Sequence, residues 1–298
     1  MLPIVDTHQH LWDLDLFHLP WAASSPILNR SYRTADYLAA TAGLNVVKAV
    51  YMEVDVTPEQ QAAEAEFIID LCQQPDTPTV GAVISGRPAA AEFEAYIRRF
   101  APSPYIKGVR QVLHVPETPP GYCLAPAYVH GVQLLGELGL SFDLCMRPAE
   151  LLDAAALVAQ CPDTQFILDH CGNADPYVIK GDAPAGDAAS DPFYHTSQQW
   201  RDGIDRLASF SNVVCKISGI VARAQPGWQP ADLAPTINYC LDAFGPDRVI
   251  FGGDWPVCTL GAPYADWATA LRAVIASRPE AEQRKLLHDN AVRLYGLE

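Results

Sequence analysis

Eight short apolar segments rich in β-branched residues alternate with longer segments of helical apolar spacing along this chain of 298 residues. Such alternation is typical of a parallel sheet, because a parallel strand needs a crossover connection to reach its neighbour. We expect the strands at residues 4–10, 46–55, 79–85, 106–113, 140–146, 165–171, 213–218 and 249–251. Eight such units predict a sheet that closes on itself as a (β/α)8 TIM barrel.

Helices are expected between the strands. We place them at residues 34–43, 57–74, 88–100, 125–138, 149–160, 197–210 and 231–244, with two more at 264–276 and 279–295. Neither a linker nor a change in composition divides the chain, so one barrel domain over residues 1–298 is the expectation. A doubly wound open sheet is the alternative, but no strand is followed by the Gly-x-Gly-x-x-Gly pattern that would favour it.

Two connections are too long to be tight turns. Residues 11–33 carry aromatic side chains that can line a pocket, which predicts an active-site loop. Residues 172–198, after the sixth strand, are rich in Gly, Ala, Asp and Pro, a composition that favours neither helix nor strand. The length of this second segment predicts a lid over the barrel.

The charge of the chain argues against two classes of partner. Lys and Arg total 20 and Asp and Glu total 35, which gives a formal net charge of −15. A field of this sign repels nucleic acids and anionic membranes, so we expect neither as a partner. The chain has no apolar run of membrane-spanning length and no signal-peptide pattern, which predicts a cytoplasmic protein acting on a small molecule.

Eight cysteines are scattered along the chain without a Cys-x-x-Cys pair, and most lie in apolar segments. We expect buried, reduced thiols in preference to a disulfide framework or a sulfur metal site. Reduced thiols also agree with a cytoplasmic location.

Polar residues gather where the predicted strands end. In a parallel barrel these carboxyl-terminal ends build the active site. Side chains two apart on a strand point the same way, so His8 and His10 are expected to share a face with Asp6. The residues expected at this end of the barrel are His8, His10, Glu53, Arg110, His114, Asp143, Arg147, His170, Lys216 and Asp254.

Four of these residues could act together. His8 and His10 from the first strand, His170 from the sixth and Asp254 from the eighth offer nitrogen and oxygen ligands, which favours one divalent metal ion, zinc above all. Such an ion, or the histidines alone, can polarise a carbonyl group for attack by water. Asp254, within Gly-Gly-Asp-Trp-Pro, is the expected general base, with a helix cap or an Asx turn as the alternative.

Several residues have two interpretations. Arg110 is either a clamp for substrate oxygens or the buried partner of Glu53 or Asp143, and Glu53 shares this ambiguity. Lys216 could simply be a solvent-exposed residue at the end of its strand, with no role in the site. Three aromatic residues could either stack on a ring substrate or pack in the core, namely Trp12, Trp21 and Trp255.

Four sequence blocks, in this order, span nearly the whole chain: VDTHQHLWD (5–13), KGVR (107–110), FILDHCG (166–172) and FGGDWP (251–256). Together they resemble the amidohydrolase superfamily, in its amidohydrolase-2 branch of lactone hydrolases. The resemblance implies a deformed TIM barrel that hydrolyses a lactone ring. It also implies that His8 and His10 match the histidine pair of the first strand, His170 the later strand-end histidine, and Asp254 the aspartate that activates water.

The resemblance places Arg110 where these enzymes present an arginine to substrate oxygens. Binuclear relatives bridge two metals through a carboxylated lysine or a glutamate on strand four, where this chain has Arg110 and His114, so we do not expect a binuclear centre. Some relatives are described as working without a tightly bound metal, so we do not expect zinc to be essential. The full set expected at the substrate is Arg110, His114, Glu53, Trp12, Trp255 and Arg147.

The expected reaction is hydrolysis of a sugar-acid lactone to the open-chain acid, with L-fuconolactone or a related aldonolactone as the leading substrate. The acidic chain and its few basic candidates (Arg110, Arg147 and Lys216) argue against a dicarboxylate lactone or pyrone, which stays an alternative substrate. Two different activities also stay open: a metal-dependent decarboxylase of the same superfamily, and a non-catalytic sugar-acid binding protein.

Overall fold

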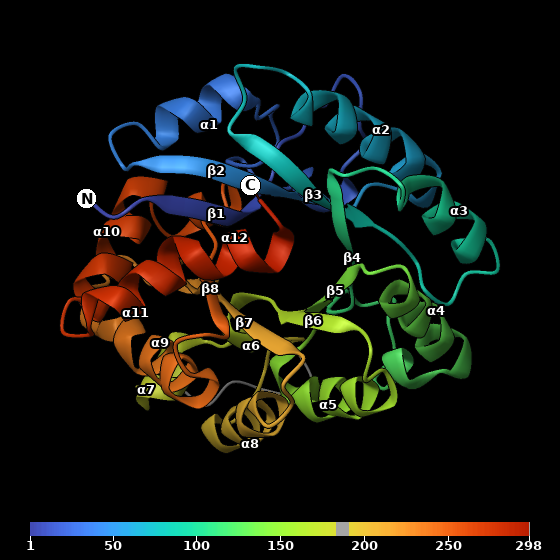
Figure 1. Cartoon of the computed structure of the whole chain (residues 1–298). Helices are drawn as coiled ribbons and strands as arrows, with labels where there is room; N and C mark the ends of the chain where they lie inside the picture. The colour runs from blue at the N-terminus through green and yellow to red at the C-terminus, as the bar shows by residue number, and fades with distance from the viewer. Residues whose placement is uncertain (183–190, 298) are drawn as a thin grey trace.

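Eight parallel strands form the centre of the molecule (Figure 1). This computed structural model describes residues 1–182 and 191–297. The strands pair in chain order and are β1 (Ile4–Gln9), β2 (Val46–Met52), β3 (Thr79–Ser85), β4 (Ile106–Val112), β5 (Ser141–Cys145), β6 (Gln165–Leu168), β7 (Val213–Ile217) and β8 (Val249–Phe251). A parallel bridge between Gln9 and Trp255 brings the residues after β8 against β1, so the sheet is nearly closed. The predicted TIM barrel is confirmed.

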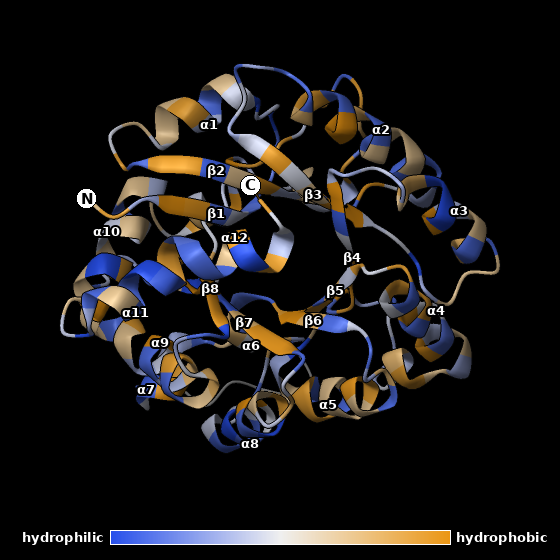
Figure 2. Cartoon of the chain, in the orientation of Figure 1, coloured by the Kyte–Doolittle hydropathy of each residue, from blue (hydrophilic) through white to orange (hydrophobic). Residues whose placement is uncertain are grey.

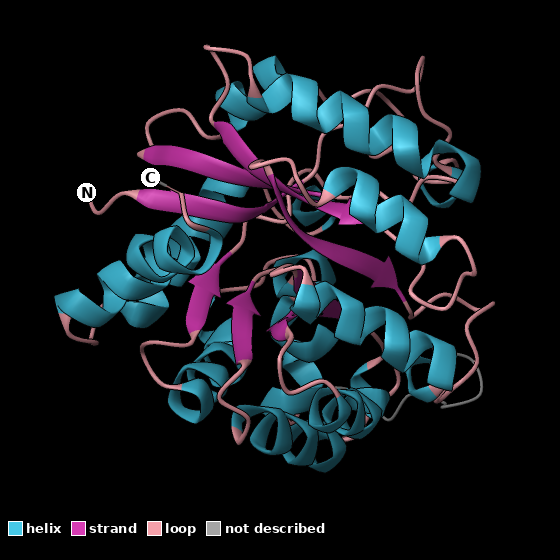
Figure 3. Ribbon diagram, turned by 45° about the vertical axis from the view of Figure 1, so that its right-hand side comes forward, coloured by secondary structure: helices cyan, strands magenta, loops and turns pink. Residues whose placement is uncertain are grey.

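Helices cover the outside of the barrel, and Figure 3 shows them in cyan around the magenta strands. They are α1 (Thr34–Ala40), α2 (Gln61–Cys72), α3 (Phe93–Phe100), α4 (Pro126–Glu137), α5 (Leu151–Gln160), α6 (His170–Asn173), α7 (Pro176–Lys180), α8 (Ser197–Ala208), α9 (Pro230–Phe244), α10 (Tyr264–Ile275), α11 (Glu280–Arg284) and α12 (Asn290–Tyr295). Other helical segments include η1 (Pro20–Ala22), η5 (Ile220–Arg223) and η7 (Lys285–Asp289). Within the described ranges, no helix is long and apolar enough to cross a membrane.

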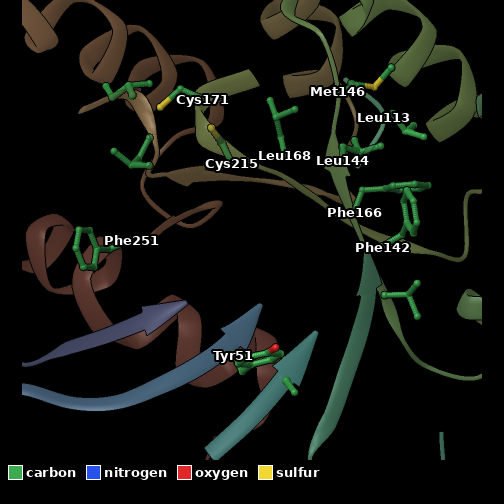
Figure 4. Close-up of a cluster of buried hydrophobic side chains, with 14 of the residues drawn as sticks. Tyr51, Leu113, Phe142, Leu144, Met146, Phe166, Leu168, Cys171, Cys215 and Phe251 are labelled. Carbon is green, nitrogen blue, oxygen red and sulfur yellow. The ribbon is translucent and has the colours of Figure 1, made fainter. Parts of the chain in front are cut away.

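The larger hydrophobic core lies between the strands and the helices around them. Phe142 of β5 contributes to it, with its ring edge-on to Tyr128 of α4 and 6.3 Å from the ring of Phe166 (Figure 4). Cys171 and Cys215 belong to the same core and are labelled in the figure. All eight cysteines are buried and unbridged, as predicted.

A smaller core fills the interior of the barrel below its open end. Its buried members are Val5, Val50, Met52, Val83, Ile167, Val214, Ile250, Ala291, Tyr295 and Leu297. Two of these belong to α12, which lies over the middle of the ring of strands in Figure 1, and Figure 2 shows β1 and β7 coloured largely as apolar. The end of the barrel where the strands begin is therefore sealed, and the carboxyl-terminal end is left to hold a site.

The sixth strand ends at Leu168 rather than at residue 171, because the chain turns sharply after it. Residues 170–173 all have positive φ, between 53° and 70°, which no strand residue adopts. Part of the predicted lid is helical instead, since α7 forms there with Asp175 accepting a hydrogen bond at its N-terminus. Residues 183–190 of that predicted lid lie outside the described residues.

Replacing Tyr295 tests whether α12 seals the barrel. Tyr295 is only 4% exposed, so Tyr295→Ala should lower the free energy of unfolding by about 3–5 kcal/mol through the cavity it leaves. The hydroxyl has no hydrogen-bond partner among the described residues, so Tyr295→Phe, the matched control, should change stability by less than about 1 kcal/mol. Guanidinium unfolding midpoints measure both. Equal midpoints for the alanine variant and the wild type would contradict the seal.

Candidate active site

Two histidines and a carboxylate converge where β1 meets the turn after β8. Asp254 Oδ1 lies 3.4 Å from His10 Nε2 and 3.6 Å from His8 Nε2. His10 Nδ1 lies 2.9 Å from the carbonyl oxygen of Met52, which can only accept, so Nδ1 carries the proton. In the neutral imidazole the lone pair is then on Nε2, which faces Asp254.

The turn that carries Asp254 depends on glycine. A Cβ atom on Gly253 would lie 2.2 Å from the ring of Tyr264, and one on Gly252 would lie 2.7 Å from the Cβ of His8. Asp254 itself has φ 54°, and its N–H donates to the carbonyl oxygen of His8 at 2.8 Å. The Gly-Gly pair thus lets this turn pack directly on β1, which brings the carboxylate to the histidines.

Asp6 does not line the cavity with His10, which corrects the expected alternation along β1. His8 is also absent from the cavity wall, since it is fully buried beneath it. The pairing of β1 with β2 shifts register between Asp6 and Gln9, and such an irregularity redirects side chains. Asp6 instead accepts hydrogen bonds from the Tyr37 hydroxyl at 2.8 Å and the Gly253 N–H at 2.7 Å. Its role is to anchor the β8 turn to β1.

His170 is held beside His8 by its own tight turn. The two rings lie 4.4 Å apart between centroids, and His170 Nδ1 is 2.9 Å from the Ser218 hydroxyl. Gly219, with φ 70°, leaves room for this ring, because a Cβ there would lie 2.2 Å from His170 Nδ1. Burial lowers the pKa of His170, so the ring is neutral near pH 7.

A buried ion network lies under His8. Lys216 Nζ lies 2.7 Å from Asp143, 2.8 Å from Asp169 and 3.2 Å from His8 Nδ1, and all four side chains are fully buried. The interpretation of Lys216 as a solvated strand end is wrong. Burial alone would raise the pKa of Asp169, but the Lys216 cation and the interaction with His8 outweigh it and hold that pKa well below its usual value. Burial lowers the pKa of His8. A neutral imidazole therefore lies among paired ions at the bottom of the site.

Arg110 is paired with Glu53, one of the two roles left open by its sequence, and it also reaches the cavity wall. Its Nε donates to Glu53 Oε1 at 2.6 Å and its Nη2 to the Glu53 carbonyl at 2.8 Å, while Nη1 lies 3.4 Å from Asp169 and 3.3 Å from His8 Nε2. The guanidinium nevertheless lines the cavity, whereas Glu53 is fully buried and does not. Glu53 therefore orients Arg110 and lies off the cavity wall.

A cavity of about 500 Å³ opens over these residues at the carboxyl-terminal end of the strands. Its lining includes His10, Arg110, His114, His170 and Asp254, all expected from the sequence. Five further polar or aromatic residues on its wall were missed, namely Ser25, Asp55, Asn173, Phe193 and Arg223. Asp55 and Asn173 lie shortly after strand ends, which is a signal present in the sequence, but Phe193 and Arg223 lie in long connections that carry none.

Two tryptophans expected at the substrate pack elsewhere. Trp12 is 1% exposed, donates from Nε1 to the Arg30 carbonyl and meets Tyr32 edge to face. Trp255, 3% exposed, also packs edge to face on Tyr32. Neither lines the cavity, because both fold inward to fasten the loop of residues 11–33 onto the barrel. Trp21, left open between the two roles, does line it.

Arg147 also lies off the cavity wall. Its guanidinium donates to the carbonyl oxygens of Val115 and Thr118, at 2.6 and 2.8 Å, and to the carboxylate of Glu150. These bonds consume its donors in holding the loop after β4. His114 of that loop reaches the cavity, where its ring lies 4.9 Å from that of Phe193.

Three of the residues fit one divalent metal ion. His8, His10 and Asp254 each offer one ligand atom, and these atoms lie within 4.8 Å of one another. Imidazole nitrogen and carboxylate oxygen are ligands that zinc takes, and the Met52 carbonyl orients His10 as such a ligand requires. His170, expected as the fourth ligand, groups with His8 and Asp169 instead.

The pH dependence of stability tests the environment of His114. Burial, together with the cation of Arg110, lowers the pKa of His114 to about 3. The unfolded chain takes up a proton near pH 6.5 and the folded chain does not, so this residue makes the protein less stable as the pH falls below 6.5. The free energy of unfolding should therefore drop by up to about 2 kcal/mol less between pH 7.5 and 5 in His114→Gln than in the wild type.

Urea unfolding at the two pH values measures this difference, and His18→Gln, at an exposed position, is the control. An unchanged pH dependence in His114→Gln would show that His114 is protonated in the folded protein.

The amidohydrolase family model matches residues 5–297. An L-fucono-1,5-lactonase from Burkholderia multivorans is 29% identical over 305 residues, which covers 98% of this chain and 96% of that protein. An L-fucono-1,5-lactonase from Burkholderia ambifaria is 24% identical over 269 residues, covering 90% and 85%. The crystal structure of an amidohydrolase from Burkholderia multivorans with bound HEPES matches 99% of both chains at 25% identity, with a TM-score of 0.83. This chain therefore belongs to the amidohydrolase family.

Proposed function

We propose that this protein hydrolyses a lactone to the corresponding hydroxy acid. The observation that carries the proposal is Asp254, whose Oδ1 lies 3.4 Å from His10 Nε2 and 3.6 Å from His8 Nε2, on the wall of a cavity that Arg110 and His170 also line. A proton acceptor and fixed positive charge thus meet at one end of the cavity. This is the combination that attack of water on an ester carbonyl requires.

Asp254 is the proposed general base. Water bound between Asp254 and the Nε2 lone pair of His10 attacks the lactone carbonyl carbon, and its proton passes to the carboxylate. When the tetrahedral intermediate collapses, the ring C–O bond breaks and the protonated Asp254 returns its proton to the departing alkoxide oxygen. The product is an open-chain hydroxy acid, and Asp254 is again ionised.

Arg110 and His170 are the proposed partners of the oxyanion. Glu53 fixes Arg110 through two hydrogen bonds, so its positive charge is in place before the reaction and needs little rearrangement during it. His170 can donate from Nε2 when its Nδ1 accepts from Ser218. A divalent ion held by His8, His10 and Asp254 would supply a Lewis acid for the carbonyl oxygen or the attacking water.

The relatives support an aldonolactone as the first substrate to test. Two of them are L-fucono-1,5-lactonases that align over most of this chain. The cavity of about 500 Å³ is large enough for a six-carbon lactone. A panel of L-fucono-, L-galactono- and L-rhamnono-lactones is therefore the starting point.

Asp254→Asn should abolish most of the hydrolysis. Removing a general base lowers the rate by roughly 10²- to 10⁴-fold, and asparagine keeps the shape of the side chain. A pH-indicator assay of the lactone panel measures the loss as acid release. Asp205→Asn, on α8 and hydrogen-bonded to Tyr239, is the control and should keep wild-type rates. Full activity in Asp254→Asn would remove the aspartate from the mechanism.

Removing metal should leave most of the hydrolysis in place. Glu53 already fixes the Arg110 cation on the cavity wall as a proposed partner of the oxyanion, so chelator-treated protein should keep its rate within about threefold. The measurement is the same assay on protein whose metal content has been determined before and after treatment. Complete loss of activity, restored by one equivalent of zinc, would assign the polarising role to the metal.

A further inference from the structure

Arg223 is a cavity residue whose charge is not used by the protein. It is the last residue of η5, and its guanidinium lines the cavity. Within residues 1–182 and 191–297 it donates no hydrogen bond and forms no ion pair, whereas every other arginine there donates at least one hydrogen bond. Leaving guanidinium N–H groups partly buried without protein acceptors costs free energy, and a ligand with acceptor atoms would recover it.

Phe193 holds Arg223 in position. The guanidinium carbon lies 3.7 Å from the centre of the Phe193 ring, and the His114 ring lies 4.9 Å from the same phenyl ring. Stacking occupies a face of the guanidinium and leaves its edge, with the N–H donors, unoccupied. Burial lowers the pKa of Arg223, but an arginine stays charged at neutral pH in any case.

The other charged groups on the cavity wall are already paired. Arg110 is bound by Glu53, and Arg87 donates to Asp55 at 3.0 Å. Asp254 faces the two histidines of β1. Among the residues that the structure describes, Arg223 is therefore the one positive group on the cavity wall without a hydrogen-bonded or ion-paired carboxylate; Asp175, Asp191 and Asp254 act on its charge only from beyond ion-pair distance.

The rest of the wall suits an apolar ring better than a polyhydroxylated one. Ser25 is the one hydroxyl side chain among the residues that line the cavity in the described structure. The apolar lining residues are Trp21, Leu28, Val54, Val112, Val115, Phe193, Ala222, Val257 and Leu260. A pocket selective for a sugar would need a partner for each hydroxyl, since unpaired hydroxyls lose their bonds to water on binding.

We propose that the substrate carries a carboxylate besides its reactive ester, and that Arg223 binds this carboxylate. The proposal rests on the proposed lactone hydrolysis and narrows its substrate to a carboxylate-bearing lactone. A carboxylate matches the planar fork of the guanidinium and accepts two parallel N–H bonds from it. The small number of basic residues expected from the sequence argued against such a substrate, but Arg223 was not among them. Two that were, Arg147 and Lys216, are bound to other protein groups.

Two lactones of nearly equal shape test the proposal. They are γ-carboxy-γ-butyrolactone and its primary amide, in which a neutral group replaces the carboxylate. Wild-type protein should open the carboxylate with a kcat/KM roughly 10- to 100-fold above that of the amide, the range for a charge-assisted hydrogen-bonded pair. Arg223→Met should reduce the ratio to less than about threefold, and Arg223→Lys should keep part of it.

Arg206→Met, on the exposed surface of α8, is the matched control and should keep the wild-type ratio. Equal kcat/KM for the two lactones in the wild type, or an unchanged preference in Arg223→Met, would overturn the proposal. Thermal unfolding of each variant separates loss of binding from loss of folding.

A binding measurement separates failure of this proposal from failure of the proposed reaction. Calorimetric titration of Asp254→Asn and of Asp254→Asn with Arg223→Met uses the same two lactones without turnover. Tighter binding of the carboxylate that disappears with Arg223→Met supports the anion site even if wild-type protein opens neither ring, a result that would reject only the lactonase. Equal binding of the two lactones overturns the anion site whatever the rates.

Discussion

The buried ion network under the open end of the barrel is the constraint on which the candidate site depends. Lys216, Asp143, Asp169, Arg110 and Glu53 come from five different strands or strand ends, and none is more than 5% exposed. Each of these charges costs several kcal/mol to remove from water, and only mutual pairing at hydrogen-bond distance offsets that cost. The network therefore forms only when the barrel brings its strands together in one register, and it holds His8 and Arg110 in place when it does.

The same network gives the site its electrostatic character. Burial keeps His8 and His170 neutral, and Glu53 and Asp169 hold the Arg110 cation at the edge of the cavity. Neutral imidazoles therefore lie beside a fixed cation, while the Asp254 carboxylate faces His10 Nε2 at 3.4 Å. In the proposed reaction these two environments would serve the oxyanion and the proton acceptor respectively.

Pairing also explains why the basic residues around the cavity differ in what they can offer to a ligand. Arg147 is committed to the carbonyl groups of the loop after β4, and Lys216 lies under the site among carboxylates. Arg223, stacked on Phe193, keeps its donors facing the cavity. From the sequence, Arg147 and Lys216 look equally able to bind a substrate, and Arg223 does not stand out. Only the partners of each residue decide which one is available to a ligand.

The sequence by itself determined the alternation of strands and helices, the barrel, and the positions of His8, His10, Arg110, His170 and Asp254 at strand ends. These follow from local physics, because side-chain spacing and strand termini are properties of short segments. Only the tertiary structure decided that Asp6 turns away from the histidines, that Trp12, Trp255 and Arg147 serve loop packing, and that Asp169 and Arg223 belong to the site. Their roles depend on partners distant in the chain, and a hydrogen bond or an ion pair exists only once folding has brought both of its members together.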